Sequence, residues 1–240
     1  MSVKFHARAV FFDAVGTLFR VRGGVGRVYW EIARPYGVTA TPEAIDQVFH
    51  EVFRAAPPLA FSRIQSRQLR RSEKDWWHAV VKEVFRRVGM VRKFDAYFEE
   101  VYRAFSGIRG WELYPETRRV LRDLKKRNFI VGIISNFDSR ILTVCTDLRI
   151  FEFIDTLQIS SRAGFAKPHP RIFQMALEEH DLAPREAVHV GDHLEEDVNG
   201  SRAAGLIPVY LDRTRSGPPP GMITISDLTE LLSLIDPLSE

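Results

Sequence analysis

Several polar side chains stand where apolar segments of the chain end, and their types suit the chemistry of phosphate or of a divalent cation. Asp13 follows the apolar run 9–12 and precedes a glycine and Thr17. Carboxylates are ligands that Mg²⁺ prefers, a lysine binds phosphate as a point charge, and hydroxyl groups donate hydrogen bonds to phosphoryl oxygens. Taken singly, each has an ordinary reading as a helix cap, a turn or a surface residue. The other members of the set, in chain order, are Ser135 with Asn136, Lys167, and Asp192 with Asp197.

The segments that must position these residues alternate between two patterns. Short apolar runs predict strands at 6–13, 129–134, 156–160, 187–190 and 207–211, with a short edge strand at 223–225. Amphipathic segments predict helices at 116–127, 140–148, 170–177 and 195–204, and a last helix capped by Ser226. Strands that alternate with helices need crossover connections, so the pattern predicts an α/β fold with a doubly wound, mostly parallel sheet. The strand ends then meet at one edge, where such sheets build their sites.

Between residues 24 and 107 the pattern is helical and rich in aromatic residues. Thr41 and Pro42 predict a helix start, with the threonine as cap and the proline in the first turn. Trp76 and Trp77 either pack in an aromatic core, which their spacing favours, or line a substrate pocket. We expect an inserted α-helical domain at 20–109 and an α/β core domain built from 1–19 and 110–240.

Composition limits the classes of function. At 240 residues and 45% hydrophobic content the chain can bury a substantial core. The net charge is +3, but residues 20–109 carry seventeen Lys or Arg against ten Asp or Glu. This excess would attract an anionic substrate, although a solvated helix face explains it more simply. No nucleic-acid-binding module accompanies it, so we expect no nucleic-acid partner.

Location follows from what the sequence lacks. Cys145 is the single cysteine, which excludes an internal disulfide and favours a reducing compartment. No signal peptide or membrane-length apolar run is evident. We therefore expect a cytoplasmic protein with no membrane partner, and the sequence leaves the oligomeric state open.

The stretch from Asp13 to Leu18, Asp-Ala-Val-Gly-Thr-Leu, resembles the first motif of the haloacid dehalogenase (HAD)-like hydrolase superfamily. Ser-Asn-Phe-Asp at 135–138, Lys-Pro-His-Pro-Arg-Ile-Phe at 167–173 and Gly-Asp at 191–192 with Asp197 resemble its later motifs. The resemblance covers almost the whole chain, including a helical cap of the C1 type between the first two motifs. It implies a Rossmann-like HAD core and looks closest to the branch that holds dehalogenases and phosphatase-like relatives.

The resemblance also implies a reaction and a set of roles. The implied reaction is that of a Mg²⁺-dependent phosphatase acting on a small phosphorylated or otherwise anionic metabolite through an aspartyl-phosphate. Asp13 and Lys167 would be catalytic, and Thr17, Ser135 and Asn136 would bind substrate. The metal ligands would be Asp13, Asp192, Asp197 and the main-chain carbonyl of Val15.

Val15 departs from the superfamily's phosphatases, which usually carry a second aspartate at this position. A valine cannot protonate a leaving group or activate water, and general acid–base catalysis typically contributes about 10² to 10⁴-fold. We therefore expect slow hydrolysis, least impaired for acidic leaving groups. His50 or His78 could substitute from the helical region, although packing or surface roles are favoured for both.

Other functions remain open. One is a phosphate- or metal-binding or regulatory protein that has lost turnover. Another is a 2-haloacid dehalogenase, which needs neither metal nor a second aspartate. Relatives with that activity place an arginine early in the cap, whereas this chain has none between Arg34 and Arg54. Phosphonate cleavage would use an early lysine, and none lies between Lys4 and Lys74.

Overall fold

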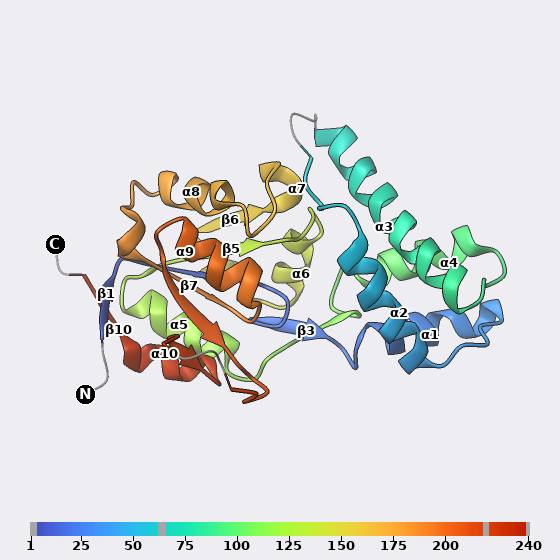
Figure 1. Ribbon diagram of the computed structural model, residues 1–240, viewed down its shortest axis with the longest axis horizontal. Helices are drawn as coiled ribbons and strands as arrows, with labels where there is room; N and C mark the ends of the chain where they lie inside the picture. The colour runs from blue at the N-terminus through green and yellow to red at the C-terminus, as the bar shows by residue number, and fades with distance from the viewer. Residues whose placement is uncertain (1–3, 62–65, 218–220, 239–240) are drawn as a thin grey trace.

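Six parallel strands form the central sheet (Figure 1). The computed structural model describes residues 4–61, 66–217 and 221–238. The strand order is β6-β5-β2-β7-β8-β9, so the chain starts in the middle, runs to one edge, and then returns to the other. This confirms the predicted doubly wound α/β fold. The strands are β2 Ala9–Phe12, β5 Ile130–Ser135, β6 Thr156–Ile159, β7 Ala187–Gly191, β8 Ile207–Leu211 and β9 Thr224–Ile225.

Helices cover both faces of the sheet, and β2 shows why. Its residues are all buried, but Val10 and Phe12 pack in the cluster that contains residues of α5 and α10, whereas Ala9 and Phe11 pack with residues of α8. Figure 1 shows α8 and the α5–α10 pair on opposite sides of the sheet. A strand buried on both faces must be apolar throughout, as this one is. The helices of this part are α5 Thr117–Lys126, α6 Ile141–Asp147, α7 Ser160–Ala163, α8 Pro170–Glu178, α9 Gly200–Ala203 and α10 Leu228–Leu234.

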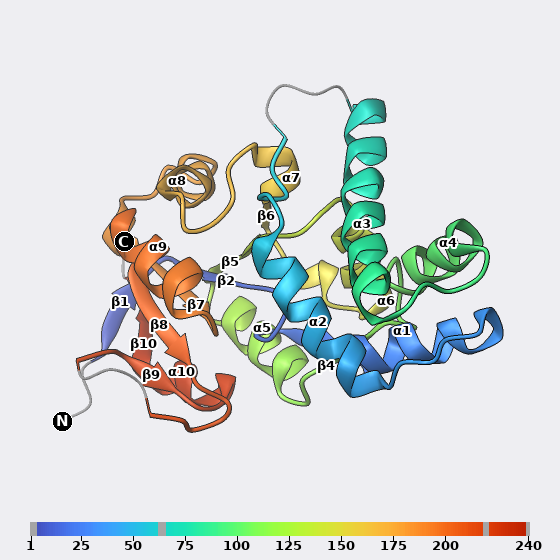
Figure 2. The same ribbon diagram turned by 45° about the vertical axis from the view of Figure 1, so that its right-hand side comes forward.

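A helical insertion, which we define as α1 to α4, lies beside the sheet between β3 (Phe19–Val21) and β4 (Trp111–Leu113). These two strands pair antiparallel and join it to the core. The predicted domain boundaries lie within or next to this two-stranded ribbon. Figure 2 shows α3 alongside α2. The helices are α1 Val25–Ala33, α2 Pro42–Ala55, α3 Ser66–Val88 and α4 Phe94–Ala104, with a short 3-10 turn at Arg34–Tyr36.

Aromatic rings fill the helical insertion. The ring of Tyr29 lies 5.7 Å from those of Phe49 and Phe105, and the rings of Phe85 and Tyr97 are 4.8 Å apart. The start of α2 is as predicted, because the Thr41 hydroxyl accepts a hydrogen bond from the Ala44 amide at 3.2 Å. Within the described residues, no helix is both long enough and apolar enough to span a membrane.

Three local predictions were wrong. The single strand expected at 6–13 is two strands, β1 Phe5–Ala7 and β2, which belong to different sheets. The helix expected at 195–204 is a π-helix at Leu194–Asn199 (η4) followed by α9, because Val198 N–H bonds to the carbonyl of His193, five residues back. The last helix is capped by Asp227, whose carboxylate accepts from Thr229 N–H at 2.8 Å. Ser226 instead donates its hydroxyl to Glu230. A short pair, β1 Phe5–Ala7 with β10 Ile235–Pro237, completes the described strands.

Candidate active site

Asp13 stands at the carboxyl end of β2, in the middle of the sheet. Its amide continues the strand by donating to the Val190 carbonyl at 2.9 Å. The chain then folds back on itself, with Gly16 N–H donating to Phe19 O at 2.8 Å. Gly16 has φ +91°, and a Cβ there would lie 2.2 Å from the Oδ2 atom of Asp192. Only glycine fits this turn, which brings the loop after Asp13 against Asp192.

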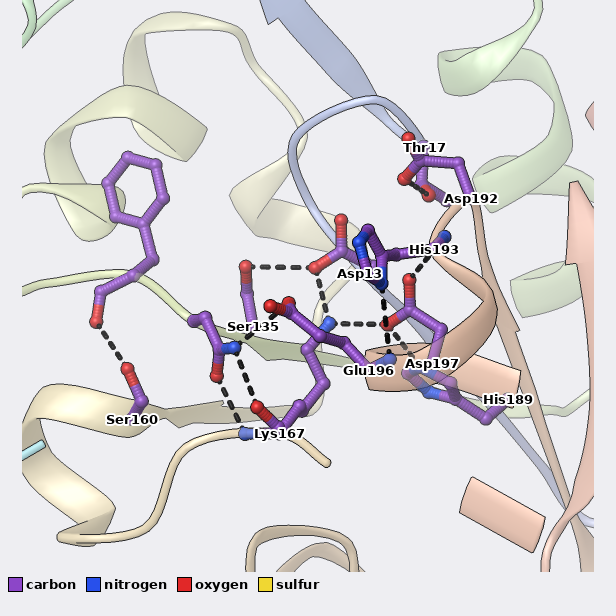
Figure 3. A network of polar contacts seen from close by, with 12 residues as sticks. Asp13, Thr17, Ser135, Ser160, Lys167, His189, Asp192, His193, Glu196 and Asp197 are labelled. Carbon is purple, nitrogen blue, oxygen red and sulfur yellow. Dashed lines mark hydrogen bonds and ion pairs between the residues drawn. The ribbon is translucent and has the colours of Figure 1, made fainter. Parts of the chain in front are cut away.

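Lys167 joins two buried carboxylates at this edge (Figure 3). Its Nζ lies 2.6 Å from Asp13 Oδ1 and 2.5 Å from Asp197 Oδ1. Burial opposes the charged ammonium, but the two carboxylates outweigh burial and raise the pKa of Lys167. Burial likewise opposes ionisation of Asp197, yet Lys167 and His189 hold its pKa below the usual range. The lysine is therefore a fixed positive charge beside Asp13.

Opposing effects act on the pKa of Asp13. Burial raises its pKa, Lys167 works against this rise, and Asp197 adds to it. The Ser135 hydroxyl donates to the same Oδ1 atom at 3.0 Å. Two donors thus fix one oxygen of the Asp13 carboxylate, which sets the direction in which the group faces.

Asp13, Asp192 and Asp197 could together hold a cation. Each offers a carboxylate oxygen, and these oxygens lie within 4.8 Å of one another. Burial and the nearby Asp13 and Asp197 raise the pKa of Asp192 to about 7, which is expected where like charges are crowded and a cation would relieve them. Both oxygens of Asp197 already accept hydrogen bonds, from Lys167, His189 and the His193 amide. Asp13 and Asp192 are therefore the better suited as direct ligands, with Asp197 holding Lys167.

Thr17 and Asn136 are near the cluster, but each is engaged with protein groups. The Thr17 hydroxyl is buried and donates to Asp192 Oδ1 at 3.2 Å. The Asn136 side chain accepts from Lys167 N–H at 2.7 Å and donates to Lys167 O at 3.0 Å. It also donates to a carboxylate oxygen of Glu196 at 2.9 Å. Thr17 thus orients Asp192, and Asn136 holds the backbone of the segment that carries Lys167.

Val15, two residues after Asp13, is 36% exposed, and its backbone pairs with Phe19. The two histidines considered as substitutes for the missing acid are bound elsewhere. His78 pairs with Asp95 at 3.0 Å, and His50 lies 3.5 Å from Asp46. Both contacts are within the helical insertion, in agreement with the packing or surface reading.

The sequence reading missed His189 and Arg213. His189 is buried in β7, and its Nε2 atom lies 3.2 Å from Asp197 Oδ1. Burial lowers the pKa of His189, so the neutral ring donates to the carboxylate. Arg213 donates to the carbonyls of Gly16 and Thr17 at 3.1 and 2.7 Å and thereby anchors the loop. The one available signal was a histidine in an otherwise apolar strand; nothing in the sequence links Arg213 to residues 16–17.

A doubly wound sheet with a helical insertion after its first strand, and with an aspartate, a lysine and two further aspartates gathered at one edge of the sheet, defines the HAD-like class of hydrolases. A family model described as haloacid dehalogenase-like hydrolase matches residues 7–205. The chain therefore belongs to the haloacid dehalogenase-like hydrolase family.

Relatives in sequence agree with this assignment. Haloacid dehalogenase-like hydrolase domain-containing protein 3 of Mus musculus is 32% identical over 213 residues, which cover 86% of this chain and 82% of the relative. Phosphoserine phosphatase of Thermus thermophilus is 33% identical over 110 residues, covering 45% of this chain and 44% of the relative.

Solved structures share the fold. L-2-haloacid dehalogenase of Xanthobacter autotrophicus is 16% identical with a TM-score of 0.72, covering 95% of this chain and 98% of that one. The HAD-hydrolase YfnB of Bacillus subtilis, in a magnesium-bound form, is 16% identical with a TM-score of 0.73 and the same coverage.

Proposed function

We propose that this protein is a Mg²⁺-dependent phosphatase that acts on a small phosphorylated metabolite through an aspartyl-phosphate at Asp13. The observation that carries the proposal is the convergence of three carboxylates within 4.8 Å beside a buried lysine. A phosphate dianion repels a carboxylate nucleophile, so the attack needs positive groups close to both the carboxylate and the phosphate. Lys167 supplies one positive charge, and the carboxylates suit a cation as the other. The magnesium named for one HAD structure is consistent with this.

The residues divide the work as follows. Asp13 would attack phosphorus, with Lys167 and Ser135 holding its Oδ1 atom so that the other oxygen faces the substrate. Asp13, Asp192 and the Val15 carbonyl would hold Mg²⁺, which keeps several waters and needs few protein ligands. When bound, the ion would neutralise charge on the phosphoryl oxygens. Thr17 would keep Asp192 in place, and Asp197 would keep Lys167 in place.

Val15 decides how fast such an enzyme can be. It supplies no proton to a leaving alkoxide and does not activate water against the aspartyl-phosphate. Aryl and acyl phosphates need the least help in leaving, so they should be the best substrates. The second, water-dependent step lacks the same group whatever the substrate, and it should therefore be slow.

Two alternative functions are also compatible with Val15. A protein that binds phosphate and metal without turnover would also tolerate Val15. A 2-haloacid dehalogenase would tolerate it as well, and its solved relatives share the fold. The acidic cluster at Asp192 and Asp197 favours a metal-dependent reaction over halide displacement.

Hydrolysis of p-nitrophenyl phosphate and acetyl phosphate, with Mg²⁺ or with a chelator, tests the proposal. We expect turnover that needs Mg²⁺ and disappears in Asp13→Asn. Asp155→Asn is a matched control, because this aspartate accepts from Val131 N–H at 2.8 Å at the amino ends of β5 and β6, the sheet edge opposite Asp13. Failure to hydrolyse a broad panel of phosphates would overturn the phosphatase, and metal-independent halide release from a 2-haloacid would establish the dehalogenase.

A further inference from the structure

A second set of buried charged residues lies outside the candidate active site, where the helical insertion meets the core. Glu73 of α3 is 1% exposed, and Asp138, which follows β5, is fully buried. Neither takes part in the chemistry proposed above. A buried carboxylate is costly unless hydrogen bonds replace its hydration, so the partners of these two groups show what they do.

Within the part of the chain that the structure describes, all three donors to Glu73 belong to the core. Its Oε1 atom accepts from the Ser139 amide at 3.1 Å, the Ser139 hydroxyl at 2.8 Å and the Ser161 hydroxyl at 2.7 Å. Ser161 lies in α7, so one carboxylate of the insertion binds two separate segments of the core. These bonds exist only while α3 rests on the core, and water would replace them if α3 moved away.

Asp138 is bound from both sides of the same junction. The indole N–H of Trp77 donates to its Oδ2 atom at 2.6 Å. Arg140 donates to the same oxygen at 2.6 Å and to Oδ1 at 2.9 Å. The guanidinium of Arg140 in turn lies 4.2 Å from the centre of the Tyr102 ring in α4. The core segment 138–140 is therefore held by α3 and α4 of the insertion.

This segment continues directly from residues of the candidate active site. Ser135 bonds to Asp13, and Asn136 bonds to the backbone N–H of Lys167 at 2.7 Å. Phe137, between them and Asp138, is buried. A shift of 138–139 would therefore reach Asp13 and Lys167 through two or three residues of well-packed chain.

We propose that Glu73 and Trp77 are positioning residues, which dock the helical insertion on Asp138 and Ser139 and thereby hold Ser135 and Asn136 in the geometry that Asp13 and Lys167 require. Docking exchanges hydrogen bonds with water for hydrogen bonds with serine and aspartate, so it is reversible. The kinetic consequence rests on the proposed function, whereas the structural consequence does not.

Amide hydrogen exchange, resolved by residue, tests the structural part in Glu73→Ala and Trp77→Phe. Matched controls lie on the same helix. Glu83→Ala removes a glutamate that pairs with Arg86 and Arg87, and Trp76→Phe removes an indole N–H that donates to Pro57 O. We expect exchange at 137–140 and at the Lys167 amide to rise by about tenfold in Trp77→Phe, which loses one hydrogen bond, and by at least as much in Glu73→Ala, which loses the acceptor of three. Exchange there should stay unchanged in the controls.

The kinetic part is measured with p-nitrophenyl phosphate and Mg²⁺. Poorer positioning of the nucleophile should lower the burst rate and kcat/KM about tenfold, whereas kcat, which the release of phosphate limits, should fall less. Exchange at 137–140 equal to that of the controls would overturn the docking role. Faster exchange there with an unchanged Lys167 amide would overturn the link to the site. Absence of hydrolysis in the natural protein would count against the proposed function alone, and Trp77→Phe decides the matter if Glu73→Ala does not fold.

Discussion

The candidate active site and the helical insertion bury different kinds of residue. In the candidate active site, Asp13, Lys167 and Asp197 are buried charges that depend on one another. In the insertion, the rings of Tyr29, Phe85 and Tyr97 are buried, and charged pairs such as Lys74 with Glu99 remain exposed. Burying charged groups lowers the stability of the fold, whereas burying aromatic rings raises it. The active site keeps its buried charges because the proposed reaction needs them. Removing one member of each group should therefore have very different effects.

The largest effect is expected from Lys167→Ala. Asp13 and Asp197 would lose their shared cation and remain buried, which should cost about 3–5 kcal/mol of unfolding free energy. Lys74→Ala in the insertion breaks an exposed pair with Glu99 and should cost below about 1 kcal/mol. Urea unfolding of both variants measures the contrast. Equal losses would mean that the strand-end charges are no more interdependent than surface pairs.

Val15→Asp should convert the site toward faster hydrolysis. A carboxylic acid at this half-exposed position could protonate an alkoxide, so alkyl phosphate turnover should rise by about 10² to 10⁴-fold. Steady-state turnover of aryl phosphates should also rise, because a carboxylate there would activate water against the aspartyl-phosphate, whereas the burst that releases their leaving group should change little, because that group needs no proton. Val15→Asn has a similar size and no acid, and serves as the control. Unchanged alkyl rates in a folded Val15→Asp would show that the missing acid does not limit the reaction.

Magnesium should stabilise the protein in a pH-dependent way. Burial and the nearby Asp13 raise the pKa of Asp192 to about 7. Without metal, the folded protein holds a proton that the unfolded chain releases at lower pH, so this carboxyl makes stability fall as the pH rises from about 4 through 7.

At pH 6 Mg²⁺ must displace this proton, whereas at pH 8 it need not. At 100 times its Kd at pH 8, Mg²⁺ should add about 2.7 kcal/mol at that pH, and the same concentration should add less at pH 6. Thermal unfolding at the two pH values measures this. An equal gain at both would contradict Asp192 as a metal ligand.

The smallest effect is expected from Tyr97→Phe in the insertion. The Tyr97 hydroxyl is buried, but its bond to the Tyr29 carbonyl is long, at 3.3 Å. Removing it keeps the ring packing and should change the unfolding free energy by less than about 1 kcal/mol. A loss as large as that of Lys167→Ala would erase the contrast between the two regions.

The same contrast explains what the sequence could predict. Strand periodicity and crossover rules placed Asp13, Ser135, Lys167 and Asp192 at one sheet edge, because topology alone brings strand ends together. Periodicity does not predict the side-chain contacts between the helical insertion and the core. Glu73 and Trp77 lie on a helix whose pattern reads as surface and aromatic core, and their partners Ser161 and Asp138 are 88 and 61 residues away. The π-helix at 194–199 was missed for a similar reason, since its register is set by hydrogen bonds rather than by apolar spacing.

The central claim is that Asp13 is a nucleophile with a phosphorylation step faster than the release of phosphate. A rapid-quench measurement with p-nitrophenyl phosphate and Mg²⁺, followed by mass spectrometry of the peptide that contains Asp13, tests it directly. We predict a burst of nitrophenol close to one equivalent per site, then slow turnover, with one added phosphoryl group on Asp13. Turnover without a burst and without a phosphorylated Asp13 would contradict the account.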